Sequence, residues 1–170
     1  SEMLERVDRI RIITALKEGE LGAEGINSII EERIFAKREA KKGEWYNGRA
    51  VMVIKNDYGF KLFNGDTGVI CDNYACFPDS NGEIRTFLPA FLPQHTTAWA
   101  ITIHKSQGSE FDHAIVLLPE NDLPLLTKEL IYTAVTRAKK RVTIVSLPDI
   151  LKKAIEKSFK RSSGLASKLR

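Results

Sequence analysis

The sequence predicts an α/β fold, in which a parallel sheet covered by helices is interrupted by a small all-β insertion. Residues 1–45 and 98–170 alternate between β-branched apolar runs and helical apolar patterns, which favours a parallel sheet with covered faces. Residues 46–97 contain instead short β-rich pieces separated by turn-forming pairs, which are typical of antiparallel hairpins. The 170 residues are enough for one domain that carries such an insertion.

The first segment predicts one strand followed by one helix. Residues 9–16 are rich in β-branched side chains and predict a buried strand, which Gly19 and Gly22 end. From Ala23 the apolar residues recur at helical spacing, and this face comprises Ile26, Ile29, Ile30 and Ile34. We expect the helix to fade into the charged run 37–42.

The middle segment predicts three short strands, over residues 50–55, 68–74 and 84–88. The pairs that should form turns around them are Asn64-Gly65, Pro78-Asp79 and Asn81-Gly82. Taken by themselves, these residues indicate a small all-β subdomain.

The last segment returns to the α/β pattern. Residues 98–103 fit a strand or a helix, whereas 114–118 predict a short apolar strand. A helix is expected over 127–138, with Thr127 as its N-cap, and a second buried strand over 142–146. A closing helix should begin at Pro148, and its apolar stripe comprises Ile150, Leu151, Ala154, Ile155 and Phe159.

Charge and composition narrow the classes of function. The net charge is +4, but residues 138–170 alone carry +8, which fits contact with a polyanion or an acidic partner, or a solvated helix face. No apolar run is long enough to span a membrane, and we expect a cytoplasmic protein. Cys71 and Cys76 lack the second ligand pair of a structural zinc site, so we interpret them as reduced thiols and expect no metal site.

Two segments carry most of the chemistry. Residues 102–112 place a hydroxyl, an imidazole, an ammonium, an amide and a carboxylate between apolar runs, and 130–141 form a similar polar segment. Each polar group buried without a partner would cost roughly 1–3 kcal/mol, so a core element would not carry so many. The pattern therefore predicts ligand-facing turns at the edge of a packed sheet.

These two segments resemble motifs V and VI of superfamily 1 helicases of the RecD type, a family that includes the alpha subunit of exodeoxyribonuclease V. The matching residues are TxHKSQGSEFD, from Thr102, and LxYTAVTRAxxR, from Leu130; segments 48–58, 62–68 and 161–165 also resemble this family. The resemblance implies a RecA-like second motor domain over 1–45 and 98–170, with an SH3-like β-barrel inserted at 46–97. It also implies 5′-to-3′ translocation on single-stranded DNA, coupled to ATP hydrolysis, in double-strand break repair and recombination.

The resemblance assigns roles to individual residues. Arg137 would be the catalytic arginine finger that reaches the γ-phosphate, with a surface arginine at a helix end as the alternative. Gly108 and Glu110 would face the nucleotide. The residues that would contact DNA are Thr102, His104, Lys105, Ser106 and Gln107, although a histidine packed beneath the turn is an alternative for His104. Asn56, Tyr58 and Asn64 resemble a segment close to DNA, and ordinary turn chemistry explains them equally well.

The sequence lacks a phosphate cradle. The nearest match, residues 43–50, has Arg49 in place of the lysine and Ala50 in place of the Mg²⁺-binding hydroxyl. We therefore expect ATP and Mg²⁺ to be held mainly by a first motor domain outside this chain, and the isolated fragment to be inactive. Expected partners are single-stranded or duplex-end DNA and RecB- and RecC-like subunits. A free-standing RecD-like helicase and a non-catalytic nucleic-acid-binding module are the alternatives.

Overall fold

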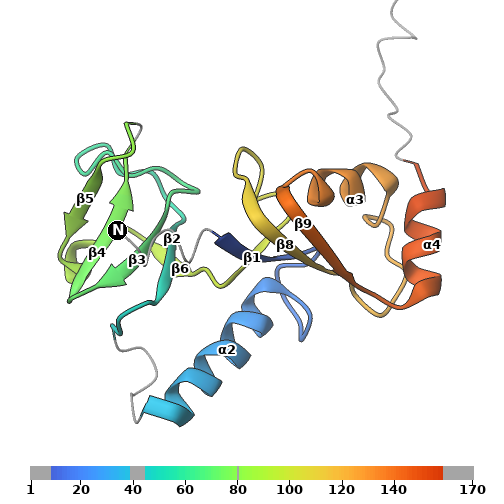
Figure 1. Ribbon diagram of the computed structural model, residues 1–170, viewed down its shortest axis with the longest axis horizontal. Coiled ribbons are helices and arrows are strands. Elements are labelled where there is room, and N and C mark those ends of the chain that lie inside the picture. The colour runs from blue at the N-terminus through green and yellow to red at the C-terminus, as the bar shows by residue number, and fades with distance from the viewer. Residues whose placement is uncertain (1–8, 39–44, 80, 159–170) are drawn as a thin grey trace, which may run out of the picture.

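The computed structural model describes residues 9–38, 45–79 and 81–158, and its strands form two separate sheets (Figure 1). The first sheet is parallel, with the order β7-β1-β8-β9. Its strands are β1 (Ile10–Thr14), β7 (Ala100–Thr102), β8 (Phe111–Leu117) and β9 (Ala138–Val145). The expected parallel α/β sheet is therefore present, and residues 98–103, which fitted either element, contain a strand.

The second sheet is antiparallel and has the order β5-β4-β3-β2-β6. It comprises β2 (Ala50–Val53), β3 (Thr67–Cys71), β4 (Tyr74–Pro78), β5 (Ile84–Phe87) and β6 (His95–Thr97), with a short 3-10 helix η1 (Pro89–Phe91) before the last strand. All five strands lie within the range expected for the insertion. Figure 1 shows this sheet to one side of the parallel sheet.

Turn chemistry explains which hairpins the sequence revealed. Gly65 and Gly82 adopt positive φ angles of 104° and 82°, as expected of the glycine in an Asn-Gly turn. The turn between β3 and β4 instead uses Asp72 and Asn73, with φ angles of 47° and 68°. Because no glycine occurs in this turn, the sequence predicted a single strand over residues 68–74, which runs across the turn from β3 into β4.

In the described part of the chain, the helices that accompany the parallel sheet are α2 (Ala23–Arg38), α3 (Lys128–Val135) and α4 (Pro148–Glu156). The predicted N-cap of α3 is confirmed, because the Thr127 hydroxyl accepts from the amide of Leu130 at 3.4 Å. Pro148 lies in the first turn of α4, where its missing N–H costs nothing. No helix within the described ranges is long and apolar enough to cross a bilayer.

One strand differs from its prediction. Residues 142–146 were expected to form a buried strand, but β9 begins at Ala138 and its side chains are largely exposed, with Val145 51% exposed. The buried-strand prediction is wrong because β9 pairs with β8 alone and lies at the edge of the sheet. Ile10 and Ile155 are likewise exposed, and Phe159 lies outside the described residues.

Within the described residues, apolar cores underlie both sheets. One lies between the parallel sheet and helices α3 and α4, and its buried members include Ile13, Ile101, Val116, Ile131 and Ile150. The other fills the insertion, and it comprises Val51, Val53, Leu62, Ile70, Ala75 and Phe77. The first core also contains Ala50 and Met52 of β2, so apolar contacts join the insertion to the parallel domain, and polar contacts add to them.

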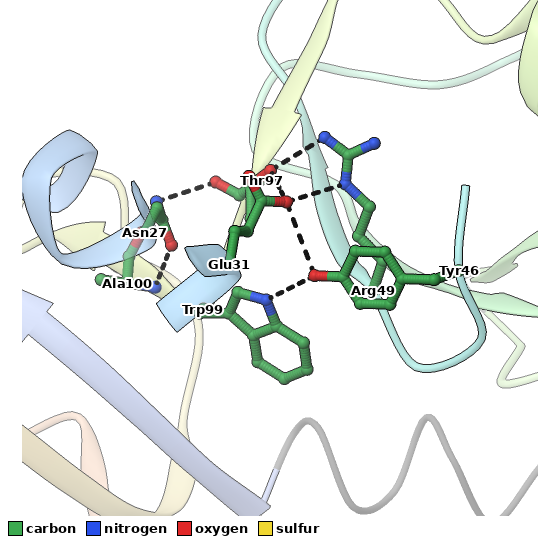
Figure 2. Close-up of polar contacts among 7 residues, drawn as sticks. All are labelled: Asn27, Glu31, Tyr46, Arg49, Thr97, Trp99 and Ala100. Carbon is green, nitrogen blue, oxygen red and sulfur yellow. Dashed lines mark hydrogen bonds and ion pairs between the residues drawn. The ribbon is translucent and has the colours of Figure 1, made fainter. Parts of the chain in front are cut away.

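A polar network centred on Glu31 of α2 supplies those contacts (Figure 2). Its Oε1 accepts a hydrogen bond from the Thr97 hydroxyl at 2.9 Å and lies 3.2 Å from Nε of Arg49. The Tyr46 hydroxyl donates to the same oxygen at 3.5 Å and accepts from Nε1 of Trp99 at 3.2 Å. Burial raises the pKa of Tyr46 above its ordinary value, so this hydroxyl remains a donor.

Asn27, one helical turn before Glu31, fixes the chain where it leaves the insertion. Its side-chain amide donates to the carbonyls of Thr97 and Ala100 at 3.0 and 2.9 Å, and its carbonyl accepts from the Ala100 amide at 2.8 Å. Figure 2 shows Asn27 and Glu31 on one side of α2, facing both chain crossings into the insertion. Helix α2 therefore clamps the entry and the exit of the insertion together.

We expect Glu31→Ala to lower the free energy of unfolding by about 3 kcal/mol, since it leaves the Arg49 guanidinium almost buried without its carboxylate. The two side chains are only 13% and 12% exposed, so water screens the pair poorly. Denaturant unfolding measures the change. Glu32→Ala, at an exposed position on the same helix, is the control and should stay within about 0.5 kcal/mol of wild type. Equal effects of the two substitutions would contradict the clamp.

Candidate functional site

The loop of residues 103–110 connects β7 to β8 and runs along the full height of the parallel sheet. Thr102 ends β7 and pairs with Thr14, the last residue of β1. Phe111 starts β8 ahead of the residue that pairs with the first residue of β1. Because the two strands are parallel, the loop must return from the carboxyl edge of the sheet to its amino edge. One short segment thus contributes residues to both edges.

Ser106 anchors this loop from inside. Its side chain is fully buried, and its hydroxyl donates to the carbonyl of Ile103 at 2.7 Å. Its backbone amide donates to the Thr102 carbonyl at 3.0 Å, and its carbonyl accepts from the Ser109 amide at 3.0 Å. Ser106 was expected at the DNA surface, but its hydroxyl closes the turn, and we do not include it in the proposed DNA contacts.

The neighbours of Ser106 point outward. His104, Lys105 and Gln107 are exposed, so His104 is not the packed histidine of the alternative interpretation. Gly108 has a φ of +85°, and a Cβ built there would meet no atom within 4 Å. Glycine is needed at this position because of its backbone conformation rather than for lack of space.

The structure brings the loop together with a distant segment of the insertion. The Lys105 ammonium donates to Oδ1 of Asn64 at 2.5 Å across 41 residues of sequence. The backbone amide of Asn64 in turn donates to Oδ1 of Asn56 at 2.8 Å. Tyr58 is 77% exposed, and its ring lies edge-on to Phe63 at 6.0 Å. The shared surface is an open groove, lined by Asn64, Gly65, Thr102, His104, Lys105, Gln107, Gly108 and Ser109.

This groove is suited to a negatively charged ligand. A lysine ammonium has three donors, and the bond to Asn64 uses one of them. Within the described residues, no carboxylate lies within ion-pair distance of Lys105. The groove therefore combines one unneutralised positive charge with amide and hydroxyl groups, a set that suits a phosphate backbone.

Arg137 lies at the other end of the loop, between α3 and β9. Its Nη1 donates to the carbonyl of Ser109 at 3.1 Å, its Nε to the Thr133 carbonyl at 3.2 Å, and its Nη2 to the Thr136 hydroxyl at 3.3 Å. Its own carbonyl accepts from the amide of Phe111 at 2.8 Å. Ser109 could not be predicted as a partner from the sequence, because the bond uses a backbone carbonyl.

All of these acceptors are neutral. No carboxylate lies within ion-pair distance of Arg137 in the part of the chain that the structure describes. A guanidinium has five N–H donors, so Nη1 and Nη2 each keep one free. The arrangement holds a half-buried, fixed fork whose positive charge has no counter-charge within these residues.

Most other charged groups near the amino edge are paired with each other. Glu110 lies 3.7 Å from the Lys139 ammonium, and both side chains are exposed. Lys140 donates to Asp112 at 2.9 Å and thereby lowers the pKa of that carboxyl. Such pairs favour a solvated face for the described part of the basic C-terminal segment, whose residues 159–170 lie outside the described ranges.

Metal binding has no support within the described ranges, which contain no group of three or more histidine, cysteine or acidic side chains placed to hold an ion. Cys71 and Cys76 lie on the paired strands β3 and β4 and are not joined by a disulfide. Burial raises the pKa of Cys76 to about 11, so at neutral pH it is a protonated thiol and a poor metal ligand.

Comparison with protein families and curated proteins gives consistent matches. The model of the UvrD-like helicase C-terminal domain matches residues 97–145, which include the loop, α3 and Arg137. The RecBCD enzyme subunit RecD of Mycolicibacterium smegmatis is 42% identical over 99% of this chain, and that of Haemophilus influenzae is 39% identical over 94%. The ATP-dependent RecD2 DNA helicase of Deinococcus radiodurans is 30% identical over 78% of the chain. The chain spans only 31%, 25% and 19% of these three relatives.

Comparison with solved structures supports the fold. Pif1 of Bacteroides bound to single-stranded DNA has a TM-score of 0.51 at 22% identity, over 88% of this chain and 43% of that chain. Pif1 of Candida albicans has a TM-score of 0.52 at 18% identity, over 89% of this chain and 51% of that chain. These likenesses indicate a RecA-like α/β domain. The RecD matches over most of this chain, with the match to the UvrD-like domain, show that this chain belongs to the RecD-type helicases, in the part that contains the C-terminal helicase domain.

Proposed function

We propose that this chain is the second motor domain of an ATP-dependent DNA helicase, which moves single-stranded DNA in the 5′-to-3′ direction. The observation that carries this proposal is the loop of residues 103–110. At one end it contacts the insertion through Lys105 and Asn64, and at the other it contacts Arg137 through the carbonyl of Ser109. One continuous segment thus joins a groove suited to phosphates and a guanidinium for which the described residues supply no counter-charge.

The DNA half of the proposal rests on the groove. Lys105 would contact phosphate oxygens, with Thr102, His104 and Gln107 beside it and Asn56 and Asn64 opposite. Tyr58 is exposed enough to stack on a base, a contact worth about 1–3 kcal/mol. The Bacteroides Pif1 structure of similar fold is a complex with single-stranded DNA, which supports this kind of ligand. In this proposal the insertion is the SH3-like barrel of the family.

The nucleotide half rests on Arg137. ATP and Mg²⁺ would be held by a first motor domain, and Arg137 would present its two remaining N–H groups to the γ-phosphate. A planar guanidinium suits charge spread over several phosphoryl oxygens, and such fingers are worth about 10³–10⁵ in rate. Gly108 would allow the backbone to approach the nucleotide, and the exposed Glu110 would accept from ribose hydroxyls.

The loop also suggests how the two halves communicate. A phosphate that draws Lys105 away from Asn64 would shift the start of the loop, and Ser106 ties that start to the Ser109 carbonyl that Arg137 binds. The position of the finger would then depend on whether DNA occupies the groove. A motor requires this coupling between DNA binding and ATP hydrolysis.

We also propose that the chain works within an exonuclease complex, beside RecB- and RecC-like subunits, in double-strand break repair and recombination. The two RecBCD subunits named above match this chain at higher identity and over more of its length than the RecD2 helicase does, which supports this setting over a free-standing helicase. Arg137, which meets no carboxylate among the described residues, argues against a purely DNA-binding module, because DNA held in the groove would not need such an arginine.

In the full-length enzyme, we expect Lys105→Ala to weaken single-strand binding similarly for all sequences. It should also reduce the steepness of log affinity against log salt by about 1, because one phosphate contact and its released counterion are lost. Fluorescence titration at several salt concentrations measures both effects. Lys152→Ala, at an exposed position on α4, is the control. An unchanged slope for Lys105→Ala would remove Lys105 from the DNA surface.

We expect Arg137→Lys in the full-length enzyme to lower kcat by about 10² or more with little change in nucleotide affinity, because the fork acts mainly in the transition state. The variant should unfold about 1–2 kcal/mol more easily, since some of the three hydrogen bonds to the loop and to α3 are lost. Steady-state kinetics and thermal melting separate these effects. Arg33→Lys, at an exposed position on α2, is the control. A folded variant with near-normal kcat would make Arg137 a structural residue.

The isolated 170-residue chain should hydrolyse no ATP, with or without DNA, because it supplies the finger without a phosphate cradle. Phosphate release from the purified chain at saturating oligonucleotide measures this. DNA-stimulated turnover by the chain alone would mean that it contains a nucleotide site of its own.

A further inference from the structure

We propose that a cavity between the parallel sheet and the insertion receives one unstacked nucleobase of the strand that lies in the groove. This inference rests on the proposed DNA function and adds a base subsite to it. The cavity has a volume of about 360 Å³, at the low end of the roughly 300–1,000 Å³ of small-molecule sites. It is bounded by the end of β1, the start of α2, strands β2 and β6, and the end of β7.

The walls of the cavity are largely apolar. Met52 and Ile54 contribute from the insertion, and Ala15, Ala23 and Ile101 from the parallel domain. Apolar surfaces on both sides of a narrow space suit a flat heterocycle, which has two apolar faces and a polar edge. A base between them would keep dispersion contacts like those that it loses when it leaves the stack of its neighbours.

The cavity continues into the DNA groove. Thr102, His104 and Lys105 line both, so a phosphate bound by Lys105 would lie beside the cavity mouth. At the rim, Lys17 pairs with Glu24 at 3.2 Å, and Lys105 adds a positive charge that no described carboxylate neutralises. The charge at the mouth thus favours a ligand attached to an anionic backbone.

The polar groups around the cavity argue against a phosphate bound inside it. The first amides of α2, those of Ala23 and Glu24, donate to the carbonyls of Leu16 and Lys17 at 3.0 and 2.9 Å, so they are not free to bind a phosphate. The Asn27 amide is fully used by Thr97 and Ala100. These amides are therefore used within the fold, and we expect the apolar walls to contribute most of the contact with a base and to discriminate little between purines and pyrimidines.

The test uses the full-length enzyme and a duplex with a single-stranded tail, which fixes the register of the strand. 2-Aminopurine is placed at each tail position in turn, because its fluorescence rises when it leaves the base stack. We expect a rise at one register, and an abasic site at that register should weaken binding about tenfold. Both measurements use the wild-type protein, so neither depends on a variant that folds.

Ala23→Leu then places an isobutyl group in the cavity, and Ala36→Leu, at an exposed position on the same helix, is its matched control. The 2-aminopurine signal and the abasic penalty should vanish in the first variant and persist in the second. If both persist in a folded Ala23→Leu protein, the base is unstacked elsewhere, and the cavity assignment is overturned.

Two further outcomes separate this inference from the proposed function. Binding that depends on Lys105, with no abasic penalty at any register, would overturn the base subsite and leave the DNA groove intact. Binding that does not depend on Lys105 would overturn the groove itself, and the subsite with it.

Discussion

The Glu31 carboxylate orients the two parts that form both candidate sites, and the apolar contacts of Ala50 and Met52 add to it. It meets Thr97 and Arg49, one from each chain crossing between the motor-like domain and the insertion. The groove beside Lys105 and the cavity are both formed from residues of the two parts, so neither keeps its shape if the insertion rotates. A buried ion pair contributes little net stability, but removing one partner is costly, and such a pair tolerates few alternative arrangements. The clamp therefore serves orientation more than stability.

The second constraint is the direction of the parallel sheet. Parallel strands need a return connection, and here a loop of eight residues provides it where a helix is usual. So short a connection must follow the sheet closely, and Ser106 holds it there by donating to the carbonyl of Ile103. The loop thus presents Lys105 at one edge and Ser109 at the other, and the proposed coupling follows from this topology.

The sequence predicted what depends on local patterns. Helix α2, the Thr127 cap and the Asn-Gly turns followed from periodicity and turn chemistry. The exposure of β9 could not be predicted, because an apolar run does not reveal that its strand lies at an edge. The convergence of Lys105 with Asn64 depends on the placement of the insertion, and the role of Ser109 depends on a backbone carbonyl. Neither feature can be predicted from a single sequence.

Arg137 shows why an incomplete site can still be well ordered. A half-buried guanidinium without a carboxylate loses part of its hydration, and three neutral acceptors only partly replace it. A nearby acidic residue would offset that cost, yet it would also neutralise the charge that a phosphoryl group needs. Fixed neutral acceptors orient the fork and leave its charge available, which is the arrangement expected of a group that stabilises charge developing on a ligand. The finger assignment thus explains the lack of a carboxylate beside Arg137 among the described residues, which a purely structural arginine would not require.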